Sequence, residues 1–233
     1  MRFSMRHPYA VHAVHAVRAC AMFLLASALG ACSSAPPAPD WQLETKGALD
    51  RSVAAYLEGN SRVEGVELAR ARNEVSSTGR IDLIARAELL HCASHVASLV
   101  FEPCSGFERL RQDAGPGERA YADYLAGKLQ PQDAALLPAT QRGAVAGGDA
   151  AVKNIADPFS RLIAAGAAFQ TGSASPAVVQ MAVDAASSQG WRRPLLAWLG
   201  VQAGLADKAG DSAEAARLRR RIELTQNDRK PAR

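Results

Sequence analysis

The sequence predicts an all-α protein, and three observations support this prediction. Apolar residues recur at helical spacing in almost every segment after residue 40. Residues that commonly cap helices, together with Gly and Pro, separate these segments. No segment alternates β-branched and polar residues between turn signals, as a strand would. We therefore expect antiparallel helical hairpins, packed either as irregular, repeat-like layers or as a compact bundle.

The first predicted helices follow one another closely. A helix covers residues 41–58, and Ser61 with Glu64 has the spacing of a capping box for the next helix. The third helix, residues 81–100, is apolar over most of its circumference, so we expect it to be central and buried. Pro103 ends it, and a short helical turn follows.

After Asp113 the predicted helices become shorter and less regular. Short helices are expected in AGPGERAYADYLAG and PQDAALLP, between glycine-rich breaks. The stretch ATQRGAVAGGDA, residues 139–150, is the least regular, and we predict a loose connection there. This connection would divide the chain into two helical subdomains, residues 40–140 and 141–233.

Four more helices are expected after this break. The dipeptides Asp-Pro at 157–158 and Ser-Pro at 175–176 each place an N-cap residue before a proline at the first helical position. A last hairpin pairs residues 193–209 with residues 211–226 around a glycine.

Two stretches resemble the helical hairpins of tetratricopeptide repeats. They are AAYLEGNSRVEGVELARARNEV, residues 54–75, and LLAWLGVQAGLADKAGDSAEAARLRRRI, residues 195–222. The resemblance implies that stacked hairpins present concave surfaces to peptides or other proteins. A regular 34-residue period is missing, so a generic bundle of helical hairpins is the alternative.

The first 31 residues are a predicted secretory signal peptide. They contain three arginines, three histidines and no acidic residue, and they end in an apolar stretch at 19–28. A basic start, a short apolar core and small final residues are typical of such signals. The core has about half of the roughly 20 residues that a membrane-spanning helix requires, so we expect no permanent transmembrane helix.

The residues Leu29-Gly30-Ala31-Cys32 resemble the lipobox of bacterial lipoproteins. In that family the cysteine sulfur receives a diacylglyceryl group, the signal is cut before the cysteine, and the new amino group is acylated. The resemblance implies a membrane anchor on Cys32. Ser33 at the next position implies sorting to the outer membrane, facing the periplasm. An ordinary cleavable signal that ends near a cysteine is the alternative.

The segment CSSAPPAP, residues 32–39, is predicted to be a lipidated cysteine followed by a tether. Its three prolines favour polyproline II, which rises about 3.1 Å per residue. Such a tether holds a folded domain roughly 20 Å from the membrane.

The net charge gives no indication of nucleic-acid binding. The chain has 27 basic and 23 acidic residues, and three of the basic residues lie in the predicted signal. The remaining 24 basic residues nearly balance the acidic ones, so we predict no nucleic-acid partner.

The remaining cysteines predict a disulfide. Cys20 leaves with the signal and Cys32 carries lipid, which leaves Cys92 and Cys104. Disulfides persist in exported proteins, so we expect these two to be linked. The bridge would close a loop of 13 residues and contribute roughly 3 kcal/mol.

The stretch ELLHCASH, residues 88–95, holds the candidate metal ligands. On a helix Glu88, His91 and His95 share one face. His91 and His95 would bind zinc, with a third ligand from Glu88, from a carboxylate of another helix or from a reduced cysteine. The spacing His-x-x-x-His is similar to that of zinc proteases, but Cys92 replaces their catalytic glutamate. We favour a structural polar stripe and predict no metal.

Motifs for catalysis are missing from the sequence. It contains neither a Gly-x-Ser-x-Gly elbow nor a phosphate-binding loop, so we expect no enzyme and no cofactor. The sequence therefore favours a lipid-anchored envelope protein that acts through protein–protein contacts, as an accessory or scaffold. The alternative is a metal-binding or enzymatic lipoprotein centred on Glu88, His91 and His95.

Two further groups of residues have two interpretations each. The arginines at 217 and 219–221 form either a solvated helix face or a patch for anionic lipid. Trp41, Trp191 and Trp198 belong either to the core or to a binding groove between helices.

Overall fold

The computed structural model describes residues 38–227, and helices occupy most of this range. The helices are, in chain order, α2 (Asp40–Glu58), α3 (Ser61–Ser76), α4 (Ile81–Ala97), α5 (Ser105–Glu108), α6 (Pro116–Leu125), the 3-10 helix η1 (Pro131–Leu136), α7 (Ala139–Lys153), α8 (Pro158–Gln170), α9 (Pro176–Gln189), α10 (Arg192–Lys208) and α11 (Ser212–Asn227). No β-strand occurs between residues 38 and 227, so the predicted all-α class is confirmed.

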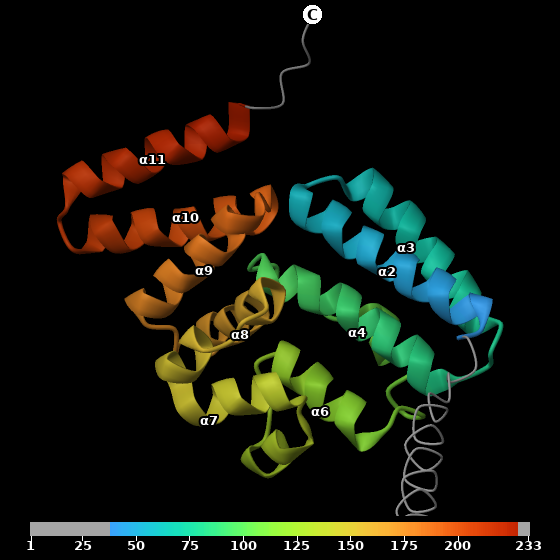
Figure 1. Cartoon of the computed structure of the whole chain (residues 1–233). Helices are drawn as coiled ribbons and strands as arrows, with labels where there is room; N and C mark the ends of the chain where they lie inside the picture. Colours follow the sequence, from blue (N-terminus) through green and yellow to red (C-terminus); the bar gives the residue numbers. More distant parts are fainter. Residues whose placement is uncertain (1–37, 228–233) are drawn as a thin grey trace, which may run out of the picture. The chain divides into compact units, whose positions relative to one another are not determined.

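Helix α4 lies at the centre of the helical body (Figure 1). The hairpin of α2 and α3 packs on one side of it, and α6 and α8 pack on the other. From α8 the chain continues through α9 and α10 to α11, each helix packed against the one before it. Helix α10 also contacts α2, far away in the sequence. The predicted central and buried position of the third helix is thus confirmed.

One apolar core joins α4, α6, α8, α9 and α10. Many of its side chains are alanines, so the helices approach one another closely. At Gly166 of α8 an added Cβ atom would lie 2.3 Å from the carbonyl oxygen of Val96. Beside this contact, Trp198 of α10 is fully buried, and its indole N–H donates a hydrogen bond to the carbonyl of Ala97 at 3.0 Å.

Several helices start and end where the local sequence predicts. The Asp157 side chain accepts a hydrogen bond from the N–H of Ser160 at 2.7 Å. The Ser175 hydroxyl accepts a hydrogen bond from the N–H of Val178, the third residue of α9, at 3.2 Å. Both predicted N-caps are therefore confirmed. Gly59 ends α2 with a left-handed φ of 86°, a conformation that glycine adopts without steric cost.

The start of α3 differs from the prediction. Asn60 caps this helix, because its side-chain oxygen accepts a hydrogen bond from the N–H of Val63 at 3.3 Å. Ser61 is the first helical residue, and its hydroxyl accepts a hydrogen bond from Arg193 instead. The predicted capping box of Ser61 and Glu64 is therefore wrong, and the Glu64 carboxylate is directed towards α4.

Residues 139–150, predicted to be a loose connection, belong to helix α7. The helix has a kink at Gly148, where φ is 54° and ψ is −140°. Glycines weaken a helix, but the alanines of this stretch favour one, and packing against α8 stabilises it further. The predicted boundary after residue 140 falls inside α7, and helices from both sides of it pack together, α4 on α8 and α2 on α10.

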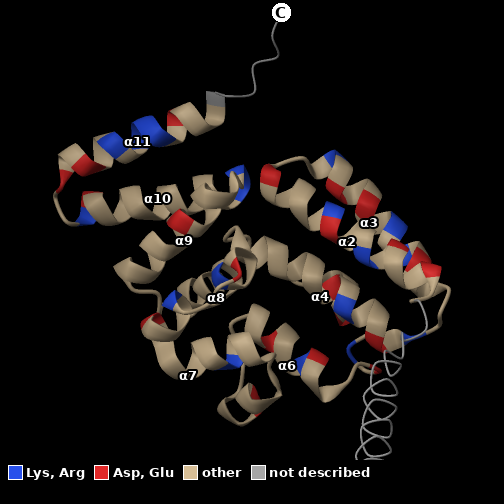
Figure 2. Cartoon of the chain, in the orientation of Figure 1, with Lys and Arg blue, Asp and Glu red and all other residues tan. Residues whose placement is uncertain are grey.

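The predicted signal peptide, the lipidation site Cys32 and most of the tether at 32–39 lie outside the described residues, so they stay predictions. Within residues 38–227, no helix combines the length and the hydropathy that a membrane span requires. Basic and acidic residues are interspersed along α2, α3 and α11 (Figure 2), in keeping with the nearly balanced charge.

Candidate functional site

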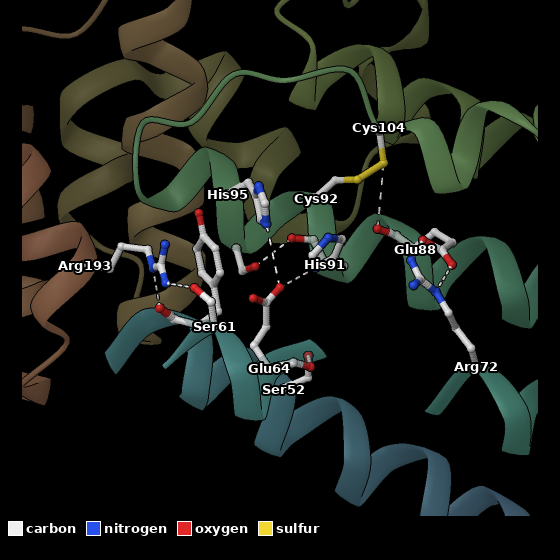
Figure 3. A network of polar contacts seen from close by, with 12 residues as sticks. Ser52, Ser61, Glu64, Arg72, Glu88, His91, Cys92, His95, Cys104 and Arg193 are labelled. Atoms are coloured by element: carbon white, nitrogen blue, oxygen red, sulfur yellow. Dashed lines mark hydrogen bonds and ion pairs between the residues drawn. A yellow bond between two sulfur atoms is a disulfide. The ribbon is translucent and has the colours of Figure 1, made fainter. Parts of the chain in front are cut away.

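Helix α4 presents two histidines to a carboxylate of α3 (Figure 3). His91 Nδ1 lies 3.3 Å from Glu64 Oε1, and His95 Nε2 lies 3.9 Å from the same oxygen. One ligand atom from each of the three residues lies within 4.8 Å of the other two. We call Glu64, His91 and His95 the Glu64–His cluster. It brings two imidazoles and one carboxylate to a single point.

Burial sets the protonation of this cluster. Burial, reinforced by the charge of Arg72, lowers the pKa of His91. Burial, reinforced by His91 and Arg193, lowers the pKa of His95 to about 4. Burial also raises the pKa of the Glu64 carboxyl, although Arg193 and Arg72 oppose this effect. Both imidazoles are therefore uncharged at neutral pH, and each keeps one nitrogen lone pair.

An aromatic and cationic layer lies beside the cluster. The ring of Tyr56 stacks on His95, with 4.3 Å between the ring centroids and 13° between the planes. The guanidinium of Arg193 lies 4.1 Å from the centroid of the same tyrosine ring, a cation–π contact. Arg193 also donates hydrogen bonds to the Tyr56 carbonyl and to the Ser61 hydroxyl, each at 2.7 Å. These contacts tie α10 to α2 and α3 at the cluster.

Glu88, the carboxylate expected beside the histidines, has a different partner. Arg72 of α3 donates two hydrogen bonds to it, from Nε and Nη2, each at 2.6 Å. The Glu88 side chain is 5% exposed, so this ion pair holds a nearly buried charge. Glu88 therefore does not join His91 and His95, and the carboxylate of the cluster comes from another helix.

The predicted disulfide is present between Cys92 of α4 and Cys104, with 5.8 Å between the Cα atoms (Figure 3). Both cysteines pack against the apolar core. The bridge removes the thiol of Cys92 from the possible metal ligands, since only a thiolate coordinates a metal.

A second feature is an apolar groove between α2 and α4, with a cavity volume of about 390 Å³. We call it the α2–α4 groove. Its apolar lining consists of Trp41, Leu49, Val75, Leu83, Ala87 and Leu90. The hydroxyl of Thr45, which also lines it, is buried and has no hydrogen-bond partner among residues 38–227. Lys46, Asp50 and Arg86 add charges of both signs.

The three tryptophans, predicted to belong either to the core or to a binding groove, lie in different surroundings. Trp198 belongs to the core and Trp41 to the groove. Trp191 is partly buried and meets Phe159 edge to face, with 6.3 Å between centroids.

Arg217, Arg219 and Arg221 of α11 pair with nearby side chains. Arg217 contacts Glu214 and Arg219 contacts Asp207, at 2.5 and 2.6 Å. Such pairing is typical of a solvated helix face.

Sequence reasoning missed Glu64 as a member of the cluster. Its spacing from Ser61 has a local explanation, the capping box, which concealed its contact with α4. The histidines were found because their spacing of four places them on one helix face.

Comparison with known proteins adds no relative: the sequence matches no protein-family model, no curated protein and no solved structure at a significant level.

Proposed function

We propose that this chain is a lipid-anchored protein of the cell envelope that faces the periplasm and acts by binding another protein. The observation that carries the proposal is the α2–α4 groove. An apolar groove between two helices suits the apolar face of a third helix, a common mode of peptide recognition. Trp41, one of its lining residues, is of the residue type that most often dominates binding energy at interfaces.

The partner we propose is a protein with an exposed amphipathic helix. Its apolar side chains would fill the groove, and a polar side chain would pair with the Thr45 hydroxyl, which has no partner among the described residues. Lys46 pairs with Asp50 and Arg86 pairs with Glu118, so the charges at the groove are already paired within the chain and the apolar lining would supply most of the binding.

The predicted anchor places this partner close to the membrane. Trp41 lies nine positions after Cys32 in the sequence. Even a fully extended chain spans at most about 3.6 Å per residue, so the groove begins within roughly 30 Å of the lipid. We therefore expect the partner to be a membrane protein or another lipid-anchored protein.

Site-specific photo-crosslinking in native membranes tests the groove. A photoreactive residue replaces Lys46, whose side chain is 75% exposed, and Val66 on α3, 64% exposed, serves as the control position. We expect one protein to be captured from position 46 and not from position 66. The variant Trp41→Ala should abolish this capture, and the purified partner should bind the wild-type chain directly. Identical capture from both positions, or capture that survives Trp41→Ala, contradicts the proposal.

Lipid labelling tests the anchor separately. Cys32→Ala should abolish labelling with a radioactive fatty acid and leave an unprocessed precursor. Wild-type protein with an unmodified Cys32 that is free in the periplasm contradicts the lipoprotein assignment.

A further inference from the structure

We infer that Glu64, His91 and His95 form a zinc site, with three protein ligands and a fourth position for water. This inference goes beyond the proposed partner binding and does not depend on the α2–α4 groove. It departs from the sequence-based prediction of no metal, and of the third ligands left open there it selects a carboxylate of another helix, Glu64 of α3, because Arg72 holds Glu88.

The distances within the cluster are close to those that a zinc ion imposes. Ligand atoms about 2.1 Å from a tetrahedral zinc lie about 3.4 Å from one another. Glu64 Oε1 already lies 3.3 Å from His91 Nδ1 and 3.9 Å from His95 Nε2. The ligand atoms of His91 and His95 lie within 4.8 Å of each other, so side-chain rotations have to bring this pair closer for all three to reach bonding distance.

The cluster also lacks a full set of hydrogen bonds. His95 Nε2 is buried and has no hydrogen-bond partner among the described residues. A buried polar atom without a partner is uncommon in a folded protein and calls for an explanation. A zinc ion bound to this nitrogen gives it a partner and at the same time offsets the charge of the Glu64 carboxylate.

The neighbouring cations do not occupy Glu64. Arg72 forms its ion pair with Glu88, at 2.6 Å. Arg193 lies over the ring of Tyr56 and donates to the Tyr56 carbonyl and the Ser61 hydroxyl. The Glu64 carboxylate thus faces the two histidines.

The ligand types select the metal. Imidazole nitrogen suits zinc, copper, nickel and iron, whereas magnesium and calcium prefer an all-oxygen shell. Two histidines and one carboxylate form the ligand set of zinc sites that keep an open position. Affinity alone does not decide, since copper(II) binds such sites more tightly than zinc, but copper(II) and nickel(II) prefer a square-planar or tetragonal shell, whereas zinc takes the tetrahedral one proposed here. We therefore assign zinc, with no thiolate ligand, because Cys92 is in the disulfide.

Tag-free metal binding tests this assignment on the full chain. The lipidated protein is purified in detergent without an affinity tag, stripped with a chelator and titrated with zinc, magnesium and calcium. We expect one zinc per chain, no binding of magnesium or calcium at the same concentrations, and a Tm that rises with zinc. A zinc content near zero after reloading, or magnesium binding as tight as zinc binding, overturns the inference.

Three glutamate variants identify the ligands. Glu64→Gln should weaken zinc binding by more than the roughly 10- to 100-fold that loss of a merely supporting residue causes. The matched control is Glu67→Gln on the same helix, whose carboxylate pairs with Arg51, and it should leave zinc affinity unchanged. Glu88→Gln tests the alternative in which Glu88 is the third ligand, and a larger loss than in Glu64→Gln overturns the assignment of Glu64.

Cobalt provides a measurement that needs no variant. Co²⁺ in the wild-type chain should show the visible absorption of a four-coordinate nitrogen and oxygen site, without the near-ultraviolet band of thiolate ligands. Zinc should displace this absorption at one equivalent. A six-coordinate cobalt spectrum, or one that zinc does not change, overturns the inference even if the glutamate variants fail to fold.

Discussion

Helix α4 packs against α6 and α8 on one side and against α2 and α3 on the other, and the two contacts differ in kind. On the α8 side, the packing depends on side-chain volume, because Gly166 allows the helices to approach and Trp198 fills the remaining space. Towards α3 the contact depends on pairing, since Arg72 holds Glu88 and Glu64 faces the histidines. On the first side a substitution acts through size, and on the second it acts through the loss of a polar partner.

The largest expected effect is on the apolar side. Trp198→Ala removes a fully buried indole and its hydrogen bond to the Ala97 carbonyl, so we expect a loss of about 3–5 kcal/mol in the free energy of unfolding. Urea denaturation followed by circular dichroism measures it. The control is Trp191→Ala, where the side chain is only partly buried, and it should cost clearly less. Equal losses would contradict the central role of Trp198.

The disulfide links α4 to the chain directly before α5, beside the apolar core, and its removal should have the next largest effect. The double variant Cys92→Ser with Cys104→Ser should lose about 3 kcal/mol of unfolding free energy, because the open loop gains conformational freedom in the unfolded chain. Urea denaturation with and without a reducing agent gives the measurement. Reduction should lower the stability of the wild-type chain to that of the variant and leave the variant unaffected. An effect of the reducing agent on the variant would point to another cause.

A glycine pair tests the role of volume more finely. Gly166→Ala places a Cβ atom against the Val96 carbonyl oxygen, so we expect a loss of about 1–3 kcal/mol. Gly200→Ala makes the same change inside α10, where nothing lies within 4 Å of the new atom, and should gain up to about 1 kcal/mol from helix propensity. Thermal and urea unfolding of both variants measure the difference. A similar change in the free energy of unfolding of both variants would show that the contact between α4 and α8 does not restrict side-chain size at position 166.

A double-mutant cycle tests pairing on the polar side. Arg72→Met leaves the nearly buried Glu88 without its partner, while Arg72 itself is 40% exposed and therefore screened by solvent. We expect the variants Arg72→Met and Glu88→Gln to be coupled by about 1 kcal/mol, so that the double variant loses less stability than the two single variants together. Additive losses, measured by urea denaturation, would mean that this ion pair contributes nothing specific.

The helices were predictable where the signals are local. An Asp or Ser before Pro at 157–158 and 175–176 caps a helix through contacts within one turn, so sequence alone identifies it. The prediction for residues 139–150 failed because glycines suggested a loop, whereas packing on α8 keeps α7 helical up to and beyond its kink. Tertiary packing of this kind has no local signal.

In the Glu64–His cluster the two histidines were predictable and Glu64 was not, for the same reason. The spacing of His91 and His95 fixes their common face, but which carboxylates meet that face depends on how α3 lies against α4. Asn60 caps α3, which leaves Glu64 available to α4, and Arg72 takes Glu88 away from the histidines. Glu64 and Arg72 lie on α3, whereas the histidines and Glu88 that they contact lie on α4. Asn60 takes the capping role that the spacing assigns to Ser61.

The contact between Arg193 and Tyr56 joins positions 137 residues apart, and this separation has a consequence for the order in which the protein is assembled. A chain made from its N-terminus completes α2, α3 and α4 long before α10 exists. Until then, the Tyr56 ring and the Ser61 hydroxyl lack the guanidinium that later covers them, and the Ala97 carbonyl lacks the Trp198 indole. Closing so long a loop adds little to the entropy cost, which grows only with the logarithm of loop length. This separation in sequence therefore affects the timing of folding more than the final stability, and the surroundings of the two histidines are complete only once α10 has formed.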